Sequence, residues 1–185
     1  MTPPGFSLFD TAIGRCGIAW GEGGIHGVQL PEGSDHATRQ RLRCASGACE
    51  AQPPPEAQRA IDAVVALLRG ERTEPDPLCA VRLDMEGVPL FHRHVYEVTR
   101  AIAPGATLTY GEVAALIGEP GAARAVGQAL GHNPFAPIVP CHRVLAAGSG
   151  AGGFSARGGV TTKLRMLLIE GAAFGAPGLF DAMGQ

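Results

Sequence analysis

The chain has 185 residues, of which 45% are hydrophobic and 17% charged, and this balance favours a folded globular protein over a disordered one. It contains no apolar run near the roughly 20 residues that a membrane-spanning helix needs, and its first residues lack the basic and apolar segments of a secretory signal. The five cysteines are odd in number and irregularly spaced, which argues against a disulfide framework. We therefore expect a cytoplasmic protein without a membrane partner.

Charge is distributed unevenly along the chain. The net charge is −2, yet residues 1–85 carry eight basic and eleven acidic side chains, whereas residues 86–171 carry seven basic and five acidic ones. The second half is thus the better candidate for contact with a polyanion, although it has no broad basic field. Any such contact must depend on a few well-placed residues.

The first half begins with short apolar segments separated by glycines. Phe6–Phe9, Gly17–Trp20 and Val28–Leu30 are predicted strands, with a hairpin turn over residues 21–24 between the last two. A short helix is expected over Asp35–Arg43.

The rest of the first half combines a loop, a helix and one more strand. The segment 44–55 is rich in Ala, Gly and Pro and is a predicted loop. Apolar residues recur at spacings of three and four over Glu56–Arg69, which predicts an amphipathic helix ended by Gly70. Val81–Met85 alternates and predicts a strand. Residues 1–87 thus form a small α+β unit without a catalytic constellation, and we expect it to support the second half.

From residue 88 onward the pattern changes to helices. Apolar spacing predicts a helix over Leu90–Ile102. Thr109 then begins a helix over Tyr110–Ile117, with Glu112 completing a capping box. A second short helix follows over Ala122–Leu130. Two short helices joined by a glycine-containing turn are typical of a helix-turn-helix, although many helical hairpins never touch DNA.

The two short helices present different faces. In the first, Val113, Leu116 and Ile117 form the expected buried stripe. In the second, Arg124 and Gln128 lie on an outer face made otherwise of small residues. A face this bare allows the backbone to approach another surface closely, with one arginine projecting from it.

A cysteine and a histidine are adjacent in the segment Pro140-Cys141-His142-Arg143-Val144. Cys141 admits three interpretations: a buried structural thiol, a metal ligand, or a nucleophile activated by the imidazole. Metal ligation is disfavoured, because adjacent side chains rarely converge on one ion and no Cys-x-x-Cys or His-x-x-x-His pair lies nearby.

This segment resembles the active-site signature of the O6-alkylguanine-DNA alkyltransferases. The resemblance covers residues 88–171 strongly and the first half only in its general pattern. It favours the nucleophile interpretation of Cys141, because several further segments follow in the order and spacing of that family. These segments are Thr109–Ala114, Ala123–Gly127, Asn133–Pro134, Gly152–Ser155 and the helix Lys163–Glu170.

The resemblance implies both a fold and a function. The fold is α+β, with a small ribonuclease-H-like N-terminal domain (residues 1–87) packed on a helical C-terminal domain (residues 88–185) that contains a winged-helix-like helix-turn-helix. The function is DNA repair by a methylated-DNA–protein-cysteine methyltransferase. The protein would act as a monomer without a cofactor, and would transfer the alkyl group of O6-alkylguanine, or of O4-alkylthymine, from duplex DNA irreversibly to Cys141. Because the product thioether is stable, each chain acts once.

The resemblance also implies roles for single residues. Cys141 accepts the alkyl group, and His142, oriented by Glu170, receives the thiol proton through a water. Tyr110 donates a hydrogen bond to the departing guanine, and Arg124 enters the duplex in place of the flipped nucleotide. The further DNA-contacting residues are Thr109, Ala123, Gly127 and Gln128. The residues expected around the substrate pocket are Asn133, Pro140, Arg143, Val144, Phe154 and Ser155.

The chemistry explains these residue types. The target is an sp³ carbon on an aromatic oxygen, so displacement needs a soft nucleophile and a leaving group that accepts a proton. A free thiol with a pKa of about 8.5 is roughly 3% thiolate at neutral pH, so full ionisation supplies only about 2 kcal/mol. Positioning and protonation of the guanine must supply the rest, and the base must first leave the duplex stack.

Three departures from the family pattern concern the pocket and a metal site. Phe154 stands where many members have tyrosine, and Ala156–Arg157 look like two extra residues. His26 has a counterpart among the zinc ligands of some members, but the matching cysteines are absent. Cys44 and Cys49 lie in a segment without a histidine partner. We therefore expect no metal.

Three alternative functions remain to be separated from this one. A non-catalytic DNA-damage sensor on the same scaffold is disfavoured, because such relatives lack the cysteine. A helix-turn-helix transcription factor is disfavoured by the missing basic patch and by the Cys-His pair. A cysteine hydrolase would need a distant His/Asn pair that the sequence does not reveal.

Overall fold

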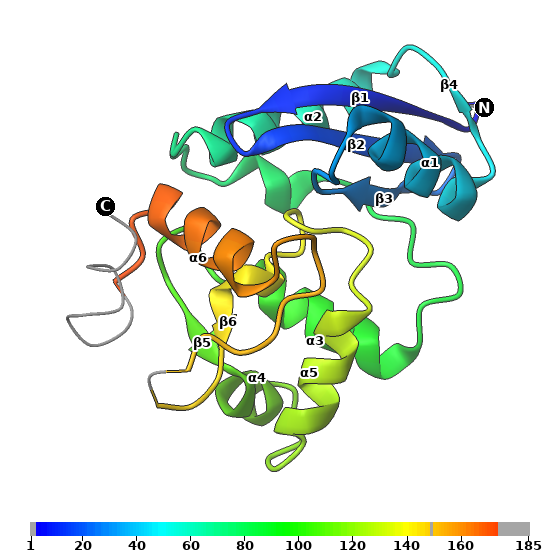
Figure 1. Ribbon diagram of the computed structural model, residues 1–185. Coiled ribbons are helices and arrows are strands. Elements are labelled where there is room, and N and C mark those ends of the chain that lie inside the picture. The colour runs from blue at the N-terminus through cyan, green and yellow to red at the C-terminus, as the bar shows by residue number, and fades with distance from the viewer. Residues whose placement is uncertain (1–2, 149, 174–185) are drawn as a thin grey trace.

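The structure is a computed structural model that describes residues 3–148 and 150–173. The last part of the predicted second domain, residues 174–185, lies outside the described residues. The described part combines helices with two sheets, which confirms the α+β class, and its two halves lie one above the other in Figure 1. Within it, no helix has both the length and the apolar character that crossing a bilayer requires.

The first half is built on a four-stranded sheet with strand order β3-β2-β1-β4. The first three strands are antiparallel, and β4 pairs with β1 in parallel at one edge. These three strands and the tight turn between β2 and β3 confirm the prediction for this region. The strand bounds are Gly5–Thr11 (β1), Gly14–Gly21 (β2), Gly24–Gln29 (β3) and Cys49–Glu50 (β4).

Helices cover both faces of this sheet, because side chains alternate along each strand. On one face, Leu42 of α1 (Asp35–Ser46) shares a hydrophobic cluster with Phe6 of β1. On the other face, α2 (Pro55–Leu68) packs against a cluster that includes Ile18 of β2. Figure 1 shows α1 in front of the sheet and α2 behind it. Both helices confirm the predicted ones to within a few residues.

Two predictions for the first half were wrong. The segment 44–55 is not a continuous loop: α1 extends to Ser46, where Gly47 ends it with a φ of 63°, and β4 follows. Val81–Met85 is not a strand but makes a single parallel bridge through Leu83 to β3, after a short 3₁₀ helix η1 (Pro77–Ala80). A longer strand cannot pair along this edge of β3, because the backbone N–H of Val28 in β3 already donates to the carbonyl of Pro134 at 2.8 Å.

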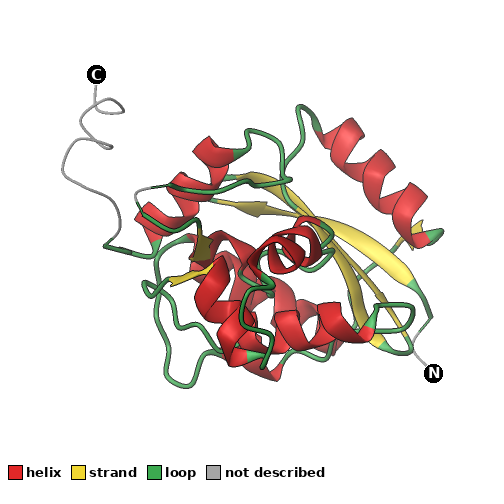
Figure 2. Ribbon diagram, turned by 90° about the horizontal axis from the view of Figure 1, so that it is seen from below, coloured by secondary structure: helices red, strands yellow, loops and turns green. Residues whose placement is uncertain are grey.

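The second half is mainly helical, with a two-stranded parallel sheet beside the helices. In Figure 2, viewed from below, its helices lie in front of the larger sheet. The helices are α3 (Leu90–Arg100), α4 (Tyr110–Leu116), α5 (Ala123–Gly131), α6 (Val160–Ile169) and the short 3₁₀ helix η2 (Cys141–Arg143). The strands are β5 (Leu108–Thr109) and β6 (Val144–Leu145).

Helices α4 and α5 form the predicted pair of short helices joined by a tight turn. Thr109 caps α4 in a complete capping box with Glu112, as predicted. The prediction that Leu116 belongs to the buried stripe of α4 was wrong, because its side chain is 62% exposed. Ala114 is buried in its place beside Val113. With only two turns available, the contact with the neighbouring helices selects which side of α4 is covered.

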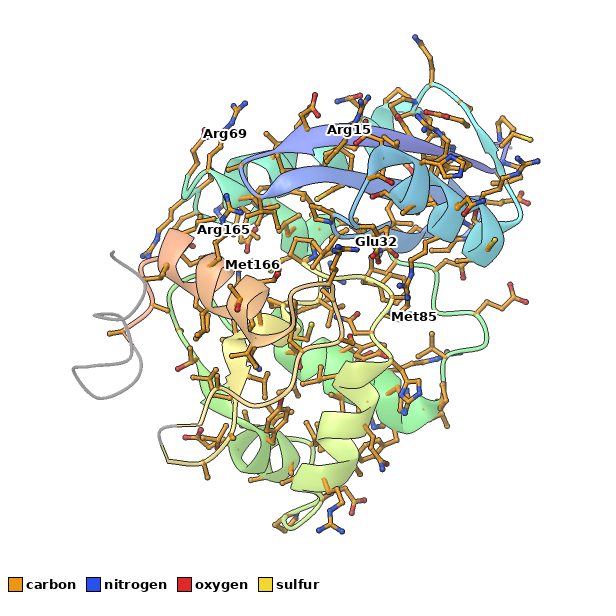
Figure 3. All side chains as sticks on the ribbon, viewed as in Figure 1. Arg15, Glu32, Arg69, Met85, Arg165 and Met166 are labelled. Atoms are coloured by element: carbon orange, nitrogen blue, oxygen red, sulfur yellow. The ribbon has the colours of Figure 1, made fainter. Side chains whose placement is uncertain are left out.

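The two halves share part of their core. Ile138 and Met166 of the second half belong to the hydrophobic cluster formed by the first half, and Phe154 packs against the clusters of both halves. Figure 3 shows Met166 and Arg165 on α6, beside the first half, and Arg165 donates to the carbonyl of Ala12 at 2.7 Å. This cluster includes residues on both sides of residue 87, and the predicted domain boundary there stays a prediction.

Candidate active site

Cys141 lies at the first residue of η2, in a loop whose shape depends on Asn133. The amide of Asn133 donates to the carbonyl of Val139 at 2.8 Å, and its oxygen accepts from the backbone N–H of Phe135 at 2.9 Å. These two bonds fold the segment between α5 and η2 into a compact turn. Cys141 is consequently held at the base of the turn and is only 7% exposed.

The surroundings of Cys141 favour the protonated form of its thiol. Burial raises its pKa above the ordinary value. The side chain of Asn133, the charge of Lys163 and the backbone N–H groups of Cys141 and His142 act in the opposite direction but do not cancel the effect. Activation of this sulfur therefore needs a nearby base.

His142 is the candidate for this base. Its side chain is fully buried, and Nε2 lies 2.8 Å from Oε1 of Glu170. An ionised carboxylate only accepts hydrogen bonds, so Nε2 carries the proton and Nδ1 keeps a free lone pair. Nδ1 is buried and has no partner in the part of the chain that the structure describes. Burial lowers the pKa of His142, which leaves the imidazole neutral and able to accept a proton.

Glu170 is the centre of a buried ionic cluster. Arg143 donates to both of its carboxylate oxygens at 2.9 Å, and the backbone N–H of Gly105 donates to Oε2 at 3.3 Å. Burial by itself would raise the pKa of Glu170, but the bonds from His142 and Arg143 lower it to about 2. The carboxylate is therefore ionised at neutral pH.

Arg143 was expected beside the substrate pocket, and the structure places it elsewhere. Its guanidinium is 2% exposed, is bonded to Glu170 and also donates to the carbonyl of Ile102. The two cavities at Cys141 are lined by other residues. Arg143 thus bonds Glu170 and lines neither of the two cavities at Cys141.

Lys163 belongs to the site, although no role was predicted for it. The side chain is fully buried, and its ammonium donates to the carbonyls of Val144 at 2.6 Å and Gly153 at 3.3 Å. It also lies 3.5 Å from the hydroxyl of Tyr110. Burial lowers the pKa of Lys163 to about 8. The sequence contained a signal for it, because a lysine four residues before Leu167 falls on the buried side of α6.

Tyr110 lies between Lys163 and the loop that follows β6. Its hydroxyl donates to the carbonyl of Gly153 at 3.5 Å, and burial raises its pKa. A Cβ at Gly152 would lie 2.8 Å from this hydroxyl, and the residue has a φ of 74°. Glycine is therefore required at position 152 for the loop to pass so close to the tyrosine.

Two cavities meet at Cys141. One, of about 560 Å³, extends along the exposed side of α5. The other, of about 220 Å³, lies towards β3 and the segment that precedes α1. Phe154 and Ser155 line both cavities, as does Gly131. The predicted pocket residues Phe154 and Ser155 thus lie, like Cys141, where the two cavities adjoin.

The helix α5 forms one wall of the larger cavity. The residues of α5 that line it include all four predicted for contact with DNA, and Arg124 and Gln128 are exposed. Thr109 was also predicted to contact DNA, but its hydroxyl already donates to Glu112 at 2.8 Å and accepts from the backbone of that residue. The α5 residues on the cavity wall are Ala123, Arg124, Gly127 and Gln128.

Two other predicted pocket residues, Pro140 and Val144, do not line the cavities themselves. Pro140 and Val144 are buried beside Cys141, and Val144 offers its carbonyl to Lys163. In residues 3–148 and 150–173, no group of three His, Cys, Asp or Glu side chains is arranged to hold a metal ion.

Residues 90–172 match the family model described as 6-O-methylguanine DNA methyltransferase, DNA binding domain. The methylated-DNA–protein-cysteine methyltransferase of Mycobacterium tuberculosis is 46% identical over 111 residues, which are 60% of this chain and 63% of that protein. The match thus spans less than two thirds of the length of this relative. The corresponding mouse protein is 32% identical over 177 residues, which are 93% of this chain and 83% of the mouse protein.

Similarity in structure extends over both halves. The crystal structure of Mycobacterium tuberculosis OGT in complex with DNA superposes with a TM-score of 0.69 and 35% identity. The superposition covers 90% of this chain and 92% of that one.

Proposed function

The chain belongs to the family of the methylated-DNA–protein-cysteine methyltransferases, and we propose that it repairs O6-alkylguanine, and O4-alkylthymine, in duplex DNA by transferring the alkyl group irreversibly to Cys141. The observation that carries the proposal is the position of Cys141. It lies at the junction of two cavities, beside a buried histidine paired with a carboxylate. One chain contains the acceptor, the base and the exposed helix, which supports action as a monomer.

The finer fold assignment is part of the same proposal. The first half, with helices on both faces of a mainly antiparallel sheet, supports a ribonuclease-H-like domain over residues 1–87. The second half, in which β5 and β6 lie next to the pair α4–α5, supports a winged-helix-like domain from residue 88 onward.

The transfer is one displacement at the alkyl carbon. A bond forms between Sγ of Cys141 and the carbon, and the bond between the carbon and O6 of guanine breaks. The thiol proton passes, through a water, to Nδ1 of His142, and Glu170 stabilises the imidazolium that results. The leaving guanine takes its proton from the hydroxyl of Tyr110, which then regains a proton from solvent. His142 afterwards releases the former thiol proton to solvent, so that the net reaction moves one proton from the thiol to the guanine.

Lys163 supports this step without touching the alkyl group. Its ammonium lies 3.5 Å from the hydroxyl of Tyr110, and its charge favours the thiolate of Cys141. A fixed positive charge in a buried site acts strongly because little water screens it.

The cavity along α5 accounts for access to a base inside DNA. The reacting atom of a stacked guanine cannot reach a buried sulfur, so the nucleotide must be extruded. A helix with small residues can enter the minor groove closely, where the sequence code is degenerate. Repair of damage at any sequence is consistent with such weak readout.

The proposal is tested by incubating the protein with a duplex that contains one O6-methylguanine. The expected result is a gain of one methyl group per chain in the intact-protein mass spectrum, with restoration of guanine in the DNA. Binding of the methylated duplex without any change of protein mass would contradict transfer and support the damage-sensing alternative.

Arg124 provides a prediction about base extrusion. Its side chain is exposed at the mouth of the larger cavity. Arg124→Ala is expected to slow repair of duplex DNA about 100-fold. Extrusion of the nucleotide costs a few kcal/mol, and the variant has no side chain to fill the space that the nucleotide leaves in the base stack. Reaction with free O6-benzylguanine should change little, since the free base needs no extrusion. Single-turnover rates on both substrates measure this.

The control for Arg124 is Arg59→Ala, which removes an exposed arginine from α2 in the first half. It should leave both rates unchanged. Equal losses on the duplex and on the free base in Arg124→Ala would show that the residue serves folding or chemistry.

Phe154 provides a prediction about substituent size. It keeps an aromatic face against which a guanine or an alkyl group can stack, worth about 0.5–1.5 kcal/mol. The cavities of about 560 and 220 Å³ on its two sides leave room for groups larger than methyl. We expect single-turnover rates to fall only modestly from methyl- to ethyl- and benzylguanine, and Phe154→Tyr to change methyl transfer by less than about tenfold. A collapse of many orders of magnitude at ethyl would mean that the pocket is rigid and narrow.

A further inference from the structure

Glu170 is also held through its backbone, by a residue of the first half. Arg72 lies in the segment that follows α2, and its guanidinium donates to the carbonyl oxygen of Glu170. The two residues are 98 positions apart in the chain. Among the described residues, the side chains that bond the Glu170 carboxylate, His142 and Arg143, come from the second half, so the contact of Arg72 is a separate link between the first half and the site.

Glycines make room for this contact. A Cβ at Gly105 would lie 2.6 Å from Nη2 of Arg72 and 3.0 Å from the carbonyl oxygen of Glu170. A Cβ at Gly171 would lie 3.4 Å from the same Nη2. The guanidinium therefore fits closely between the two glycines, at the end of α6. Gly105 also donates its N–H to the Glu170 carboxylate, so Arg72 packs against the loop that bonds the carboxylate.

The position of Arg72 suits the chemistry of a helix end. Glu170 is the C-cap of α6, and the last carbonyls of a helix have no partner within the helix. A positive charge at this end is favoured by the helix dipole. The main chain at Gly70 also packs against the end of α6, since a Cβ at Gly70 would lie 2.9 Å from the carbonyl oxygen of Ile169. The segment after α2 thus fixes the backbone from which the Glu170 carboxylate projects.

We propose that Arg72 is a positioning residue for alkyl transfer, which fixes the end of α6 and the Gly105 loop so that Glu170 stays aligned with His142. This inference rests on the proposed function of Cys141 and His142, and it gives the first half a part in the chemistry. Arg72 touches neither the cavities at Cys141 nor the exposed side of α5. It acts only through Glu170.

The test compares Arg72→Ala and Arg72→Lys with the control Arg69→Ala. Arg69 lies three positions earlier and points away from the molecule in Figure 3, with no hydrogen bond or ion pair from its side chain to the described residues. Arg72→Ala is expected to lower the single-turnover rate on methylated duplex about tenfold, the scale of one charge-assisted hydrogen bond. Arg72→Lys should recover most of the rate, and Arg69→Ala should match the wild type. Affinity for the duplex should be unchanged in all three.

A second measurement separates positioning from general stability and does not need DNA. The rate at which iodoacetamide alkylates Cys141 at neutral pH, followed by peptide mass spectrometry, reports the fraction of the thiolate–imidazolium pair, which forms from the thiol and the neutral imidazole by internal proton transfer. A misaligned Glu170 stabilises that pair less, so the alkylation rate in Arg72→Ala should fall about tenfold. Arg72→Lys should restore the rate.

Wild-type rates of both transfer and alkylation in folded Arg72→Ala would overturn the inference, as would a loss that Arg72→Lys does not recover while both variants melt like the wild type. If the wild-type protein transferred nothing from DNA, the proposed function would fail. The iodoacetamide rates would still decide whether Arg72 aligns the pair.

Discussion

Replacing Cys141 with alanine is expected to abolish transfer of the methyl group from duplex DNA to the protein. Alanine has no lone pair with which to attack the alkyl carbon, so no covalent product can form at this position. Cys141→Ser should also be inactive within the detection limit, because a buried hydroxyl is a far weaker nucleophile than a thiolate. Both variants should still bind the methylated duplex, since the exposed side of α5 is unchanged.

The other four cysteines are not expected to substitute for it. Cys16 is fully buried in the first half, and burial raises its pKa to about 12. Cys44, Cys49 and Cys79 are exposed, but none lines the cavities at Cys141. Peptide mass spectrometry of the methylated protein measures this directly. A methyl group on any other cysteine, or transfer by Cys141→Ala, would contradict the assignment. The matched control is Cys79→Ser, which should transfer one methyl group per chain.

Replacing Glu170 with glutamine is expected to have the second-largest effect on the rate. The amide still accepts a hydrogen bond from Nε2 of His142, but it carries no charge to stabilise the imidazolium formed during transfer. Removing such a buried electrostatic partner typically costs a factor of about 10² to 10³ in rate. Single-turnover kinetics on methylated duplex measure the change, and a rate within twofold of wild type would exclude the proposed role of Glu170.

The same substitution leaves the guanidinium of Arg143 buried without its charge partner. Breaking one side of a buried ion pair costs about 3–5 kcal/mol in unfolding free energy. The double variant Arg143→Met/Glu170→Gln removes both charges and should recover much of this stability, while its transfer rate stays low. This variant therefore separates loss of chemistry from loss of the fold.

The contribution of Glu170 to stability depends on pH in a defined direction. Its pKa in the folded protein is about 2, below the ordinary value of 4.5. The stabilisation is therefore fully present above pH 4.5 and is lost as the pH falls from 4.5 towards 2. The difference of about 2.5 pH units corresponds to roughly 3 kcal/mol. Urea unfolding of wild type and Glu170→Gln should show a difference in unfolding free energy that is constant above pH 5 and shrinks below it.

Much of the secondary structure could be predicted because its signals are local. The capping box of Thr109 and Glu112 and the apolar spacing of α2 concern residues within a few positions of each other. The same holds for Cys141 and His142, which are adjacent in a recognisable segment. Where two segments compete for one partner, local signals fail. The predicted strand over Val81–Met85 is a single bridge, because the edge of β3 also serves Pro134.

The partners of the buried charges depended on the fold. The sequence, through its resemblance to the family, predicted the acceptor cysteine, its histidine, the carboxylate at position 170 and the helix that bears Arg124. It did not indicate that Arg143 bonds this carboxylate and turns away from the pocket, or that Lys163 lies buried beside Tyr110. Only the tertiary structure decides such pairings, because the energy of a buried charge depends on which distant groups surround it and not on its sequence neighbours.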